Sequence, residues 1–147
     1  MKIQVAVLFG GKSVEHEISV ISALQAMNSI PVEKYDIIPV YITKSGEFYT
    51  GAPLREINRY RDIPALLGDC VKVAFVPQNG RTAIVRTPGK KFGNNTVAIP
   101  DVAFPIVHGT NVEDGNLQGF LGTLGLPYVG CDVLSSAVGM DKITMKR

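Results

Sequence analysis

The chain has 147 residues, and its 46% hydrophobic and 19% charged content is typical of a globular domain with its own core and excludes a disordered segment. The 15 basic and 13 acidic residues leave a net charge of +2, which gives no reason to expect nucleic acid or an anionic membrane as a partner. No apolar run approaches the ~18 residues of a membrane span, and the amino-terminal residues lack the pattern of a signal peptide.

Residues 1–42 predict a β-α-β unit with a right-handed crossover. Residues 3–9 form a valine-rich apolar run, typical of a strand covered on both faces, and residues 35–42 form a second strand. Between them, Gly-Gly-Lys-Ser ends the first strand, and a helix begins near Ser13 with acidic residues in its first turn. The apolar stripe expected to face the sheet consists of Val14, Ile18, Ile21, Leu24 and Met27.

The middle of the chain, residues 48–96, predicts a less regular elaboration of the α/β core. Pro39, inside the preceding strand, argues against a central place for that strand in the sheet. Asn79-Gly80 is a strong hairpin signal because both residues tolerate a positive φ. The expected elements are strands at 48–50, 71–76 and 82–86, a short helix at 54–60 and a loop at 88–96.

A strand, a polar loop and a helix follow one another over residues 102–125. The apolar run 102–107 predicts a buried strand that stops at His108-Gly109, and apolar residues at helical spacing then predict a helix. Asp114 is placed to cap the start of that helix and Gly125 to cap its end. Such a loop, at the carboxyl end of a strand, is where open α/β sheets keep their ligand sites.

The last residues predict a short strand at 126–130 and a helix at 135–146, and the chain ends within that helical pattern. We therefore expect a truncated piece of a longer protein. Cys70 and Cys131 lie far apart without CxxC spacing, which favours buried reduced thiols over a disulfide and a cytoplasmic location.

Several common site motifs are absent. Gly11-Lys12-Ser13 resembles the end of a P-loop, but the glycine required five residues before Gly11 is Ala6. No G-x-G-x-x-G, H-E-x-x-H, G-x-S-x-G or Cys/His cluster occurs, so we predict no metal ligands here. The remaining polar residues each allow a structural reading: Glu15 and Glu17 as first-turn helix acids, His108 as a strand-end histidine, and Lys142 as a solvated lysine.

Three blocks of the chain, in this order and spacing, resemble the D-alanine–D-alanine ligases of bacterial cell-wall synthesis. The first is Val7–Ser19, VLFGGKSVEHEIS, and the second is His108–Gly119, HGTNVEDGNLQG. The third is Leu126–Lys142, which contains Pro-Tyr-x-Gly and ends in Ser-Ser-Ala-x-x-Met-Asp-Lys. One position departs from the family pattern, because the glycine usual between Gly109 and Gly115 in the second block is Val112 here. A β-branched valine resists a positive φ, so either the loop follows another path or the chain represents a subgroup.

The resemblance implies an α/β fold with an open, mostly parallel sheet and helices on both faces, similar to other pre-ATP-grasp and Rossmann-like domains. It implies an amino-terminal substrate-binding domain over residues 1–130, with a hairpin-containing elaboration at 48–96. Residues 131–147 would begin the central ATP-grasp domain. If strands 3–9 and 102–107 are parallel, their loops open on one edge of the sheet and converge.

The family reaction uses ATP and magnesium to phosphorylate the carboxylate of one D-alanine, and the amine of a second D-alanine attacks the acyl phosphate. By position, Glu15 matches the residue that holds the first ammonium group, and His108 matches a histidine near that substrate's carboxylate. Lys142 matches a lysine that reaches the ATP phosphates. Magnesium and most of ATP would be bound beyond this chain, which alone should be inactive. The resemblance also implies a cytoplasmic homodimer in peptidoglycan precursor synthesis. Ligases that use D-lactate or D-serine, and a non-catalytic binding or assembly module, remain alternatives.

Overall fold

Three parallel strands form the part of the sheet that resembles a doubly wound fold. The computed structural model describes residues 1–146. In it, β1 (Ile3–Gly10) pairs in parallel with β2 (Tyr35–Ile42) on one side and with β7 (Val102–Ile106) on the other. The interior of β1 is buried on both faces, as its continuous apolar run predicts. All three strands therefore direct their carboxyl ends toward the same edge of the sheet.

The elaboration extends this same sheet. The full strand order is β6-β5-β4-β3-β2-β1-β7, and every pair from β2 to β6 is antiparallel. These four added strands are β3 (Phe48–Thr50), β4 (Val71–Gln78), β5 (Arg81–Arg86) and β6 (Thr96–Ala98). The α/β class is confirmed, with one correction. The sheet is mixed rather than mostly parallel, because four of its six strand pairs are antiparallel.

The β4–β5 hairpin turns at Asn79 and Gly80, with φ values of 52° and 74°. This confirms the predicted turn, since a two-residue hairpin loop with both φ values positive matches the twist of its strands. Pro39 lies in β2, which is paired on both sides despite the prediction. Its carbonyl accepts a hydrogen bond from Thr50 Oγ1 at 2.6 Å, so its nitrogen also faces the β3 side. The β2–β3 ladder begins only at Val40, and no ladder hydrogen bond is lost.

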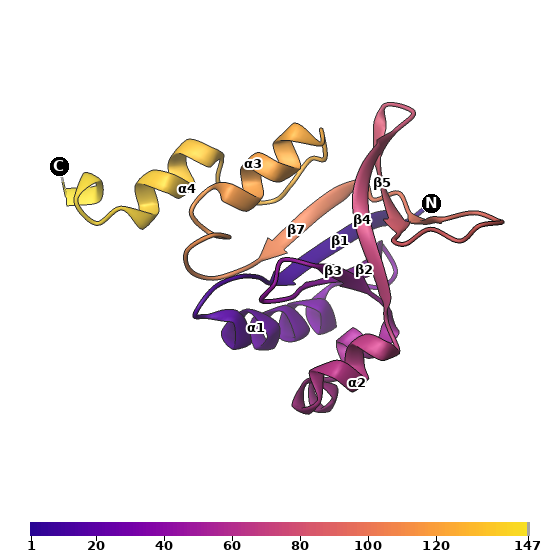
Figure 1. Cartoon of the computed structure of the whole chain (residues 1–147). Helices are drawn as coiled ribbons and strands as arrows, with labels where there is room; N and C mark the ends of the chain where they lie inside the picture. The colour runs from indigo at the N-terminus through magenta and orange to yellow at the C-terminus, as the bar shows by residue number, and fades with distance from the viewer. Residues whose placement is uncertain (147) are drawn as a thin grey trace.

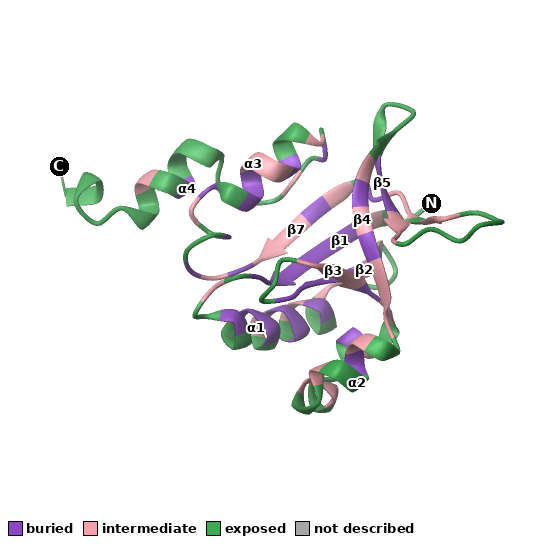
Figure 2. Ribbon diagram, in the orientation of Figure 1, coloured by how far each residue is buried: buried purple, intermediate pink, exposed green. Residues whose placement is uncertain are grey.

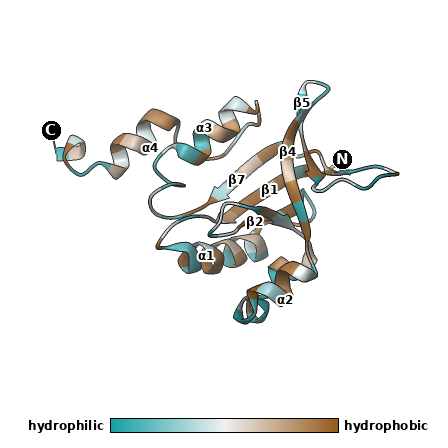
Figure 3. Cartoon of the chain, in the orientation of Figure 1, coloured by the Kyte–Doolittle hydropathy of each residue, from teal (hydrophilic) through white to brown (hydrophobic). Residues whose placement is uncertain are grey.

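Helices cover both faces of the sheet, as predicted (Figures 1 and 2). On one face, α1 (His16–Ser29), the 3-10 helices η1 (Ala52–Arg55) and η2 (Ile57–Arg61), and α2 (Ile63–Gly68) enclose a core cluster. On the other face, α3 (Asn116–Thr123) packs Leu117 and Leu121 into a second cluster. The chain ends with α4 (Val133–Met140) and η3 (Thr144–Lys146). Figure 3 shows hydrophobic residues along the central strands and hydrophilic residues in the hairpin and long loop.

The buried face of α1 differs from the predicted stripe. Val14, Ile18 and Ile21 are exposed, Val14 to 91%. Only Leu24 and Met27 of the predicted stripe are buried. The buried residues of the helix are His16, Ser19, Val20, Ala23, Leu24 and Met27. The prediction was wrong because two polar residues with buried hydrogen-bond partners face the sheet, and hydropathy alone assigns such residues to solvent.

Several other boundaries also differ. The predicted 54–60 helix is the η1–η2 pair, while α2 and β6 were not predicted. The predicted 126–130 strand reduces to a single bridge between Tyr128 and Ala103, and the predicted 135–146 helix breaks after Met140. Cys70 is half-buried and Cys131 exposed, both as free thiols. Within residues 1–146, no helix has the length and apolar character needed to cross a membrane.

Candidate functional site

The loops that follow β1 and β7 meet at the carboxyl edge of the parallel strands. Ser13 Oγ donates a hydrogen bond to the His108 carbonyl at 2.6 Å, and Asn111 Nδ2 donates to the Lys12 carbonyl at 3.1 Å. The predicted convergence of the two loops is therefore confirmed. It follows from the topology, since parallel neighbouring strands deliver their loops to one edge.

Glu15 lies at the amino end of α1, where it is the N-cap residue without a capping hydrogen bond from its own side chain. The carboxylate faces Gly109 of the other loop: a Cβ atom added there would lie 3.6 Å from Glu15 Oε1 and would collide with Ser13 Oγ. Gly109 also has a φ of +85°. A glycine is thus required at this point, both by the backbone and by the close approach of the two loops.

His108 contacts the α1 segment through both its backbone and its ring. Its carbonyl accepts from Ser13, while its ring Nε2 lies 3.3 Å from Ser22 Oγ on α1. The ring is half-buried. The loops therefore bring Glu15 and the His108 backbone to Ser13, and the Glu15 carboxylate lies at a helix amino terminus. Such a set can bind an ammonium group and an anion side by side.

Lys142 is not part of this group. It follows α4 and is exposed, and its side chain has no hydrogen bond or ion pair with the rest of residues 1–146. Figure 1 shows the carboxy-terminal end beyond α4, away from the α1 loop. No group of three or more His, Cys, Asp or Glu side chains in residues 1–146 is arranged to hold a metal ion. The described residues therefore do not form a magnesium site.

The loop contains Val112 at the position where the family pattern has a glycine. The positive φ is taken by Asn111, at 68°, instead of by Val112. Asparagine adopts this conformation more readily than other non-glycine residues. The Val112 side chain is buried and covers Gly11, whose own φ is +97°. In this loop the valine is a core residue, and the left-handed conformation falls one residue earlier.

Asp114 and Glu113 stabilise the same loop. Glu113 Oε2 accepts from the Gly109 amide at 2.8 Å, and Asp114 Oδ2 accepts from the Asn111 amide at 2.8 Å. Burial raises the pKa of Asp114, but hydrogen bonds from Asn111 and Asn116 outweigh it and hold that pKa below its usual value. The sequence predicted Asp114 as the N-cap of α3, and this prediction was wrong. That position is Gly115 with a φ of 98°, because the preceding turn uses the Asp114 carboxylate.

Two residues beside the site were missed by sequence reasoning. His16 is buried, with Nδ1 2.7 Å from the Gly11 carbonyl and Nε2 2.8 Å from Tyr41 Oη. Ser19 Oγ accepts from the Gly10 amide at 2.7 Å and donates to the Ile106 carbonyl at 2.5 Å. Both side chains tie the glycine turn to its neighbours. The available signal was their spacing, since positions 16, 19, 20, 23 and 27 share one helix face.

Residues 4–131 match the family model described as "D-ala D-ala ligase N-terminus". The chain belongs to this family. It is 41% identical over 145 residues to the D-alanine–D-alanine ligase of Thermosipho melanesiensis, and 43% identical over 150 residues to that of Geobacillus kaustophilus. The alignments cover 98% and 99% of this chain but 38% of each relative, so the chain spans about two fifths of their length.

Solved structures of family members share the fold. The D-alanine–D-alanine ligase from Coxiella burnetii has a TM-score of 0.83 and 34% identity, covering 99% of this chain and 40% of that one. The VanG D-Ala:D-Ser ligase from Enterococcus faecalis has a TM-score of 0.76 and 33% identity, covering 98% and 40%. The mixed seven-stranded sheet is thus the fold of the ligase amino-terminal domain.

Proposed function

We propose that this chain is the amino-terminal, substrate-binding part of an ATP-dependent D-alanine–D-alanine ligase. Residues 1–130 would form the substrate-binding domain and residues 131–147 would begin the ATP-grasp part. The whole protein would join two D-alanines through an acyl phosphate, releasing ADP and phosphate, for peptidoglycan precursor synthesis in the cytoplasm. We expect it to act as a homodimer, and the 147-residue chain alone to be inactive.

The observation that carries this proposal is the meeting of Glu15, Gly109 and His108 on one edge of the sheet. In the proposed complex, the Glu15 carboxylate holds the ammonium group of the first D-alanine by a charge-assisted hydrogen bond. The backbone amides at the start of α1 favour an anion, which suits the carboxylate of the same molecule. His108 donates a hydrogen bond to the negative charge that develops on that carboxylate during phosphoryl transfer.

ATP and magnesium belong to the part of the reaction for which this chain supplies little. Lys142 is the single candidate here for the ATP phosphates, and its exposed ammonium group is available for that contact. ATP supplies the phosphoryl group that activates the first carboxylate. Because the described residues do not form a magnesium site, we assign no step of this chain to the metal ion.

A second candidate is a ligase that joins D-alanine to D-serine, supported by the similarity to the VanG enzyme. The first-substrate site proposed above would serve either enzyme equally. The second substrate would be selected largely by residues outside this chain, so the two candidates differ in product and share the roles of Glu15 and His108.

The decisive experiment measures phosphate release by the full open reading frame that encodes these residues, in the presence of ATP and magnesium. D-Alanine alone is compared with D-alanine plus D-serine or D-lactate, and the products are identified by mass spectrometry. His108→Ala should lower kcat/KM for D-alanine by about 100-fold or more, as loss of a transition-state hydrogen-bond donor does elsewhere. Glu15→Gln should also lower it sharply, because it removes the negative charge that accepts from the ammonium group. Glu33→Gln, at an exposed turn residue, is the matched control and should leave activity unchanged.

Three results would lead to different conclusions. Phosphate release that requires D-alanine and falls in both variants supports the enzyme and the site. D-Alanine-dependent release that is unimpaired in both variants supports the ligase activity but refutes the proposed roles of Glu15 and His108. A folded full-length protein with no D-alanine-dependent release would refute the ligase and favour a binding or assembly module.

A further inference from the structure

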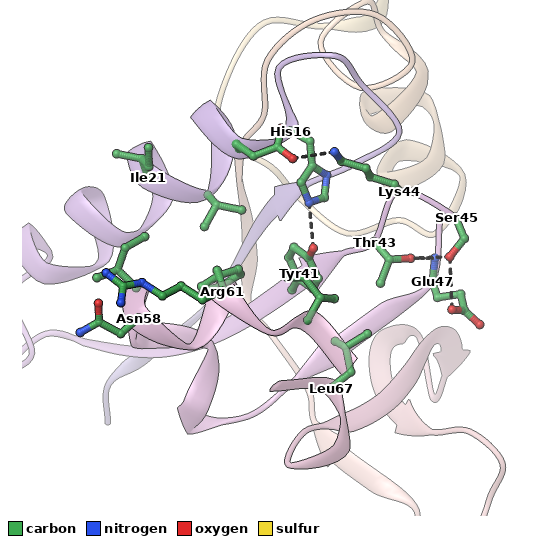
Figure 4. Close-up of a pocket in the computed structure, with 15 residues that line it drawn as sticks. His16, Ile21, Tyr41, Thr43, Lys44, Ser45, Glu47, Asn58, Arg61 and Leu67 are labelled. Atoms are coloured by element: carbon green, nitrogen blue, oxygen red, sulfur yellow. Dashed lines mark hydrogen bonds and ion pairs between the residues drawn. The ribbon is translucent and has the colours of Figure 1, made fainter. Parts of the chain in front are cut away.

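A cavity lies on the α1 face of the sheet, between that helix and the η2–α2 segment (Figure 4). Its volume is about 760 Å³, within the roughly 300–1,000 Å³ typical of small-molecule sites. Neither Glu15 nor His108 lines it. Glu17 does, because residues two apart on a helix point in different directions. The cavity is therefore separate from the site where the two loops converge.

The cavity is mainly apolar in its middle. Tyr41 lies at its centre in Figure 4, with Ile21 on the helix side and Leu67 on the α2 side. The rings of Tyr41 and Tyr60 meet edge to face, with centroids 5.6 Å apart. Aromatic edges and branched aliphatic side chains of this kind favour an apolar, ring-bearing ligand over a fully polar one.

The charges around the cavity leave one cation unpaired. Lys44 forms an ion pair with Glu17, and Glu47 forms one with Lys72. Arg61 has no hydrogen bond or ion pair with any group in residues 1–146. In Figure 4 its guanidinium lies beside the amide of Asn58, at the end of the cavity opposite Ser45 and Glu47. An unpaired guanidinium next to an amide is suited to a planar carboxylate.

The same charges argue against a polyanion. Two carboxylates, those of Glu17 and Glu47, line the cavity. A phosphate or diphosphate would meet both of them while gaining only one unpaired cation. A single carboxylate at the Arg61 end avoids this repulsion, because Glu17 is paired with Lys44 and Glu47 lies beside Ser45, at the other end of the cavity in Figure 4.

We propose that this cavity is a second small-molecule site, which binds a monocarboxylic acid with an apolar, ring-bearing body. The carboxylate pairs with Arg61 and Asn58, and the ring lies against Tyr41, Ile21 and Leu67. This site is independent of the proposed ligase activity, since none of these residues belongs to the Glu15–His108 group.

The test is a titration of the 147-residue chain, labelled with ¹⁵N and followed by amide chemical shifts. The probes are 3-phenylpropionate, its uncharged analogue 3-phenylpropionamide, and D-alanine, which has a carboxylate without an apolar body. We expect 3-phenylpropionate to shift the amides of residues 41–47 and 57–67 in a saturable manner. The amide analogue should bind about 3–10-fold more weakly, as expected for loss of a partly exposed charge-assisted hydrogen bond. D-Alanine should leave these amides unmoved.

Arg61→Gln should remove most of the difference in affinity between 3-phenylpropionate and 3-phenylpropionamide. Lys90→Gln removes one positive charge from the distant 88–95 loop and should preserve that difference. Dispersed spectra of both variants establish that they are folded. The proposal is overturned if 3-phenylpropionate gives no saturable shifts in these two segments, or shifts mainly the residues around Val14 or Gly109. It is also overturned if acid and amide bind equally in the unmodified chain, or if D-alanine occupies the same residues.

Discussion

Val112 covers Gly11 so closely that a Cβ atom added to the glycine would lie 2.5 Å from Val112 Cγ1. The valine that departs from the family motif and the second glycine of the β1–α1 turn therefore depend on each other. The Val112 side chain fills the space that the missing side chain of Gly11 leaves free, and Gly11 adopts a φ of +97°.

Gly11→Ala should lower the free energy of unfolding for two separable reasons. A left-handed backbone costs a non-glycine residue about 1–2 kcal/mol, and overpacking costs about 1–3 kcal/mol more. Adding Val112→Ala should recover the second part alone, giving a coupling of roughly 1–2 kcal/mol in a double-mutant cycle. The measurement is urea unfolding of the four proteins.

Gly46→Ala provides the matched control for that cycle. Gly46 has a φ of +86°, but an added Cβ there would have no atom within 4 Å. This variant should therefore show the backbone cost without the collision. Strict additivity of Gly11→Ala and Val112→Ala would contradict the close contact between the two residues.

Ser19→Ala should destabilise the protein by about 1–3 kcal/mol, because it leaves buried backbone groups without partners. The Ser19 hydroxyl is fully buried and connects the Gly10 amide to the Ile106 carbonyl. Ser29→Ala removes an exposed hydroxyl that bonds within the same helix, and should change stability by less than about 0.5 kcal/mol. Equal effects of the two substitutions in chemical unfolding would count against the bridging role of Ser19.

Alkaline pH should reveal the buried tyrosines. Burial, with a smaller contribution from the negative charge of Glu17, raises the pKa of Tyr41 from 10.0 to about 12. Because the folded-state pKa lies above the unfolded-state value, this stabilisation is complete below pH 10 and is lost as the pH rises toward 12. Burial likewise raises the pKa of Tyr60. Stability should therefore fall steeply between pH 10 and 12.

The contribution of Tyr41 to that fall is at most about 2–3 kcal/mol, from two pKa units at roughly 1.4 kcal/mol each. Tyr41→Phe should flatten the decline measured by unfolding at successive pH values. Tyr49→Phe is the control, since the Tyr49 hydroxyl has no hydrogen-bond partner in residues 1–146. If Tyr41→Phe keeps the full slope, ionisation of Tyr41 is not coupled to unfolding.

In the full-length protein, Lys142→Ala should raise KM for ATP while leaving KM for the first D-alanine nearly unchanged. The physical reason is that Lys142 lies outside the Glu15–His108 group and would contact only the phosphates. Lys146→Ala, a nearby exposed lysine on η3, should leave both constants unaffected. Loss of D-alanine affinity in Lys142→Ala would show that the lysine acts at the substrate site instead.

Local and topological signals predicted the strands and the convergence of the two loops better than they predicted the buried helix faces. Strands β2 and β3 were predicted with their observed bounds, because apolar runs and turn residues define strands locally. The convergence of the Ser13 and His108 loops followed from the parallel order of β1 and β7. Hydropathy failed on α1, where buried His16 replaces exposed Ile18 on the inner face. Whether a polar side chain finds a buried partner depends on residues distant in the sequence, such as Tyr41.

The environment of His16 also fixes the direction of its hydrogen bonds. The Gly11 carbonyl can only accept, so in the neutral ring Nδ1 carries the proton, and the Tyr41 hydroxyl must donate to Nε2. A flipped ring would turn carbon atoms toward both partners. His16 therefore links the glycine turn to the end of β2. A turn held in this way is already ordered, so the D-alanine that we propose to bind beside it would spend little of its affinity on ordering the backbone.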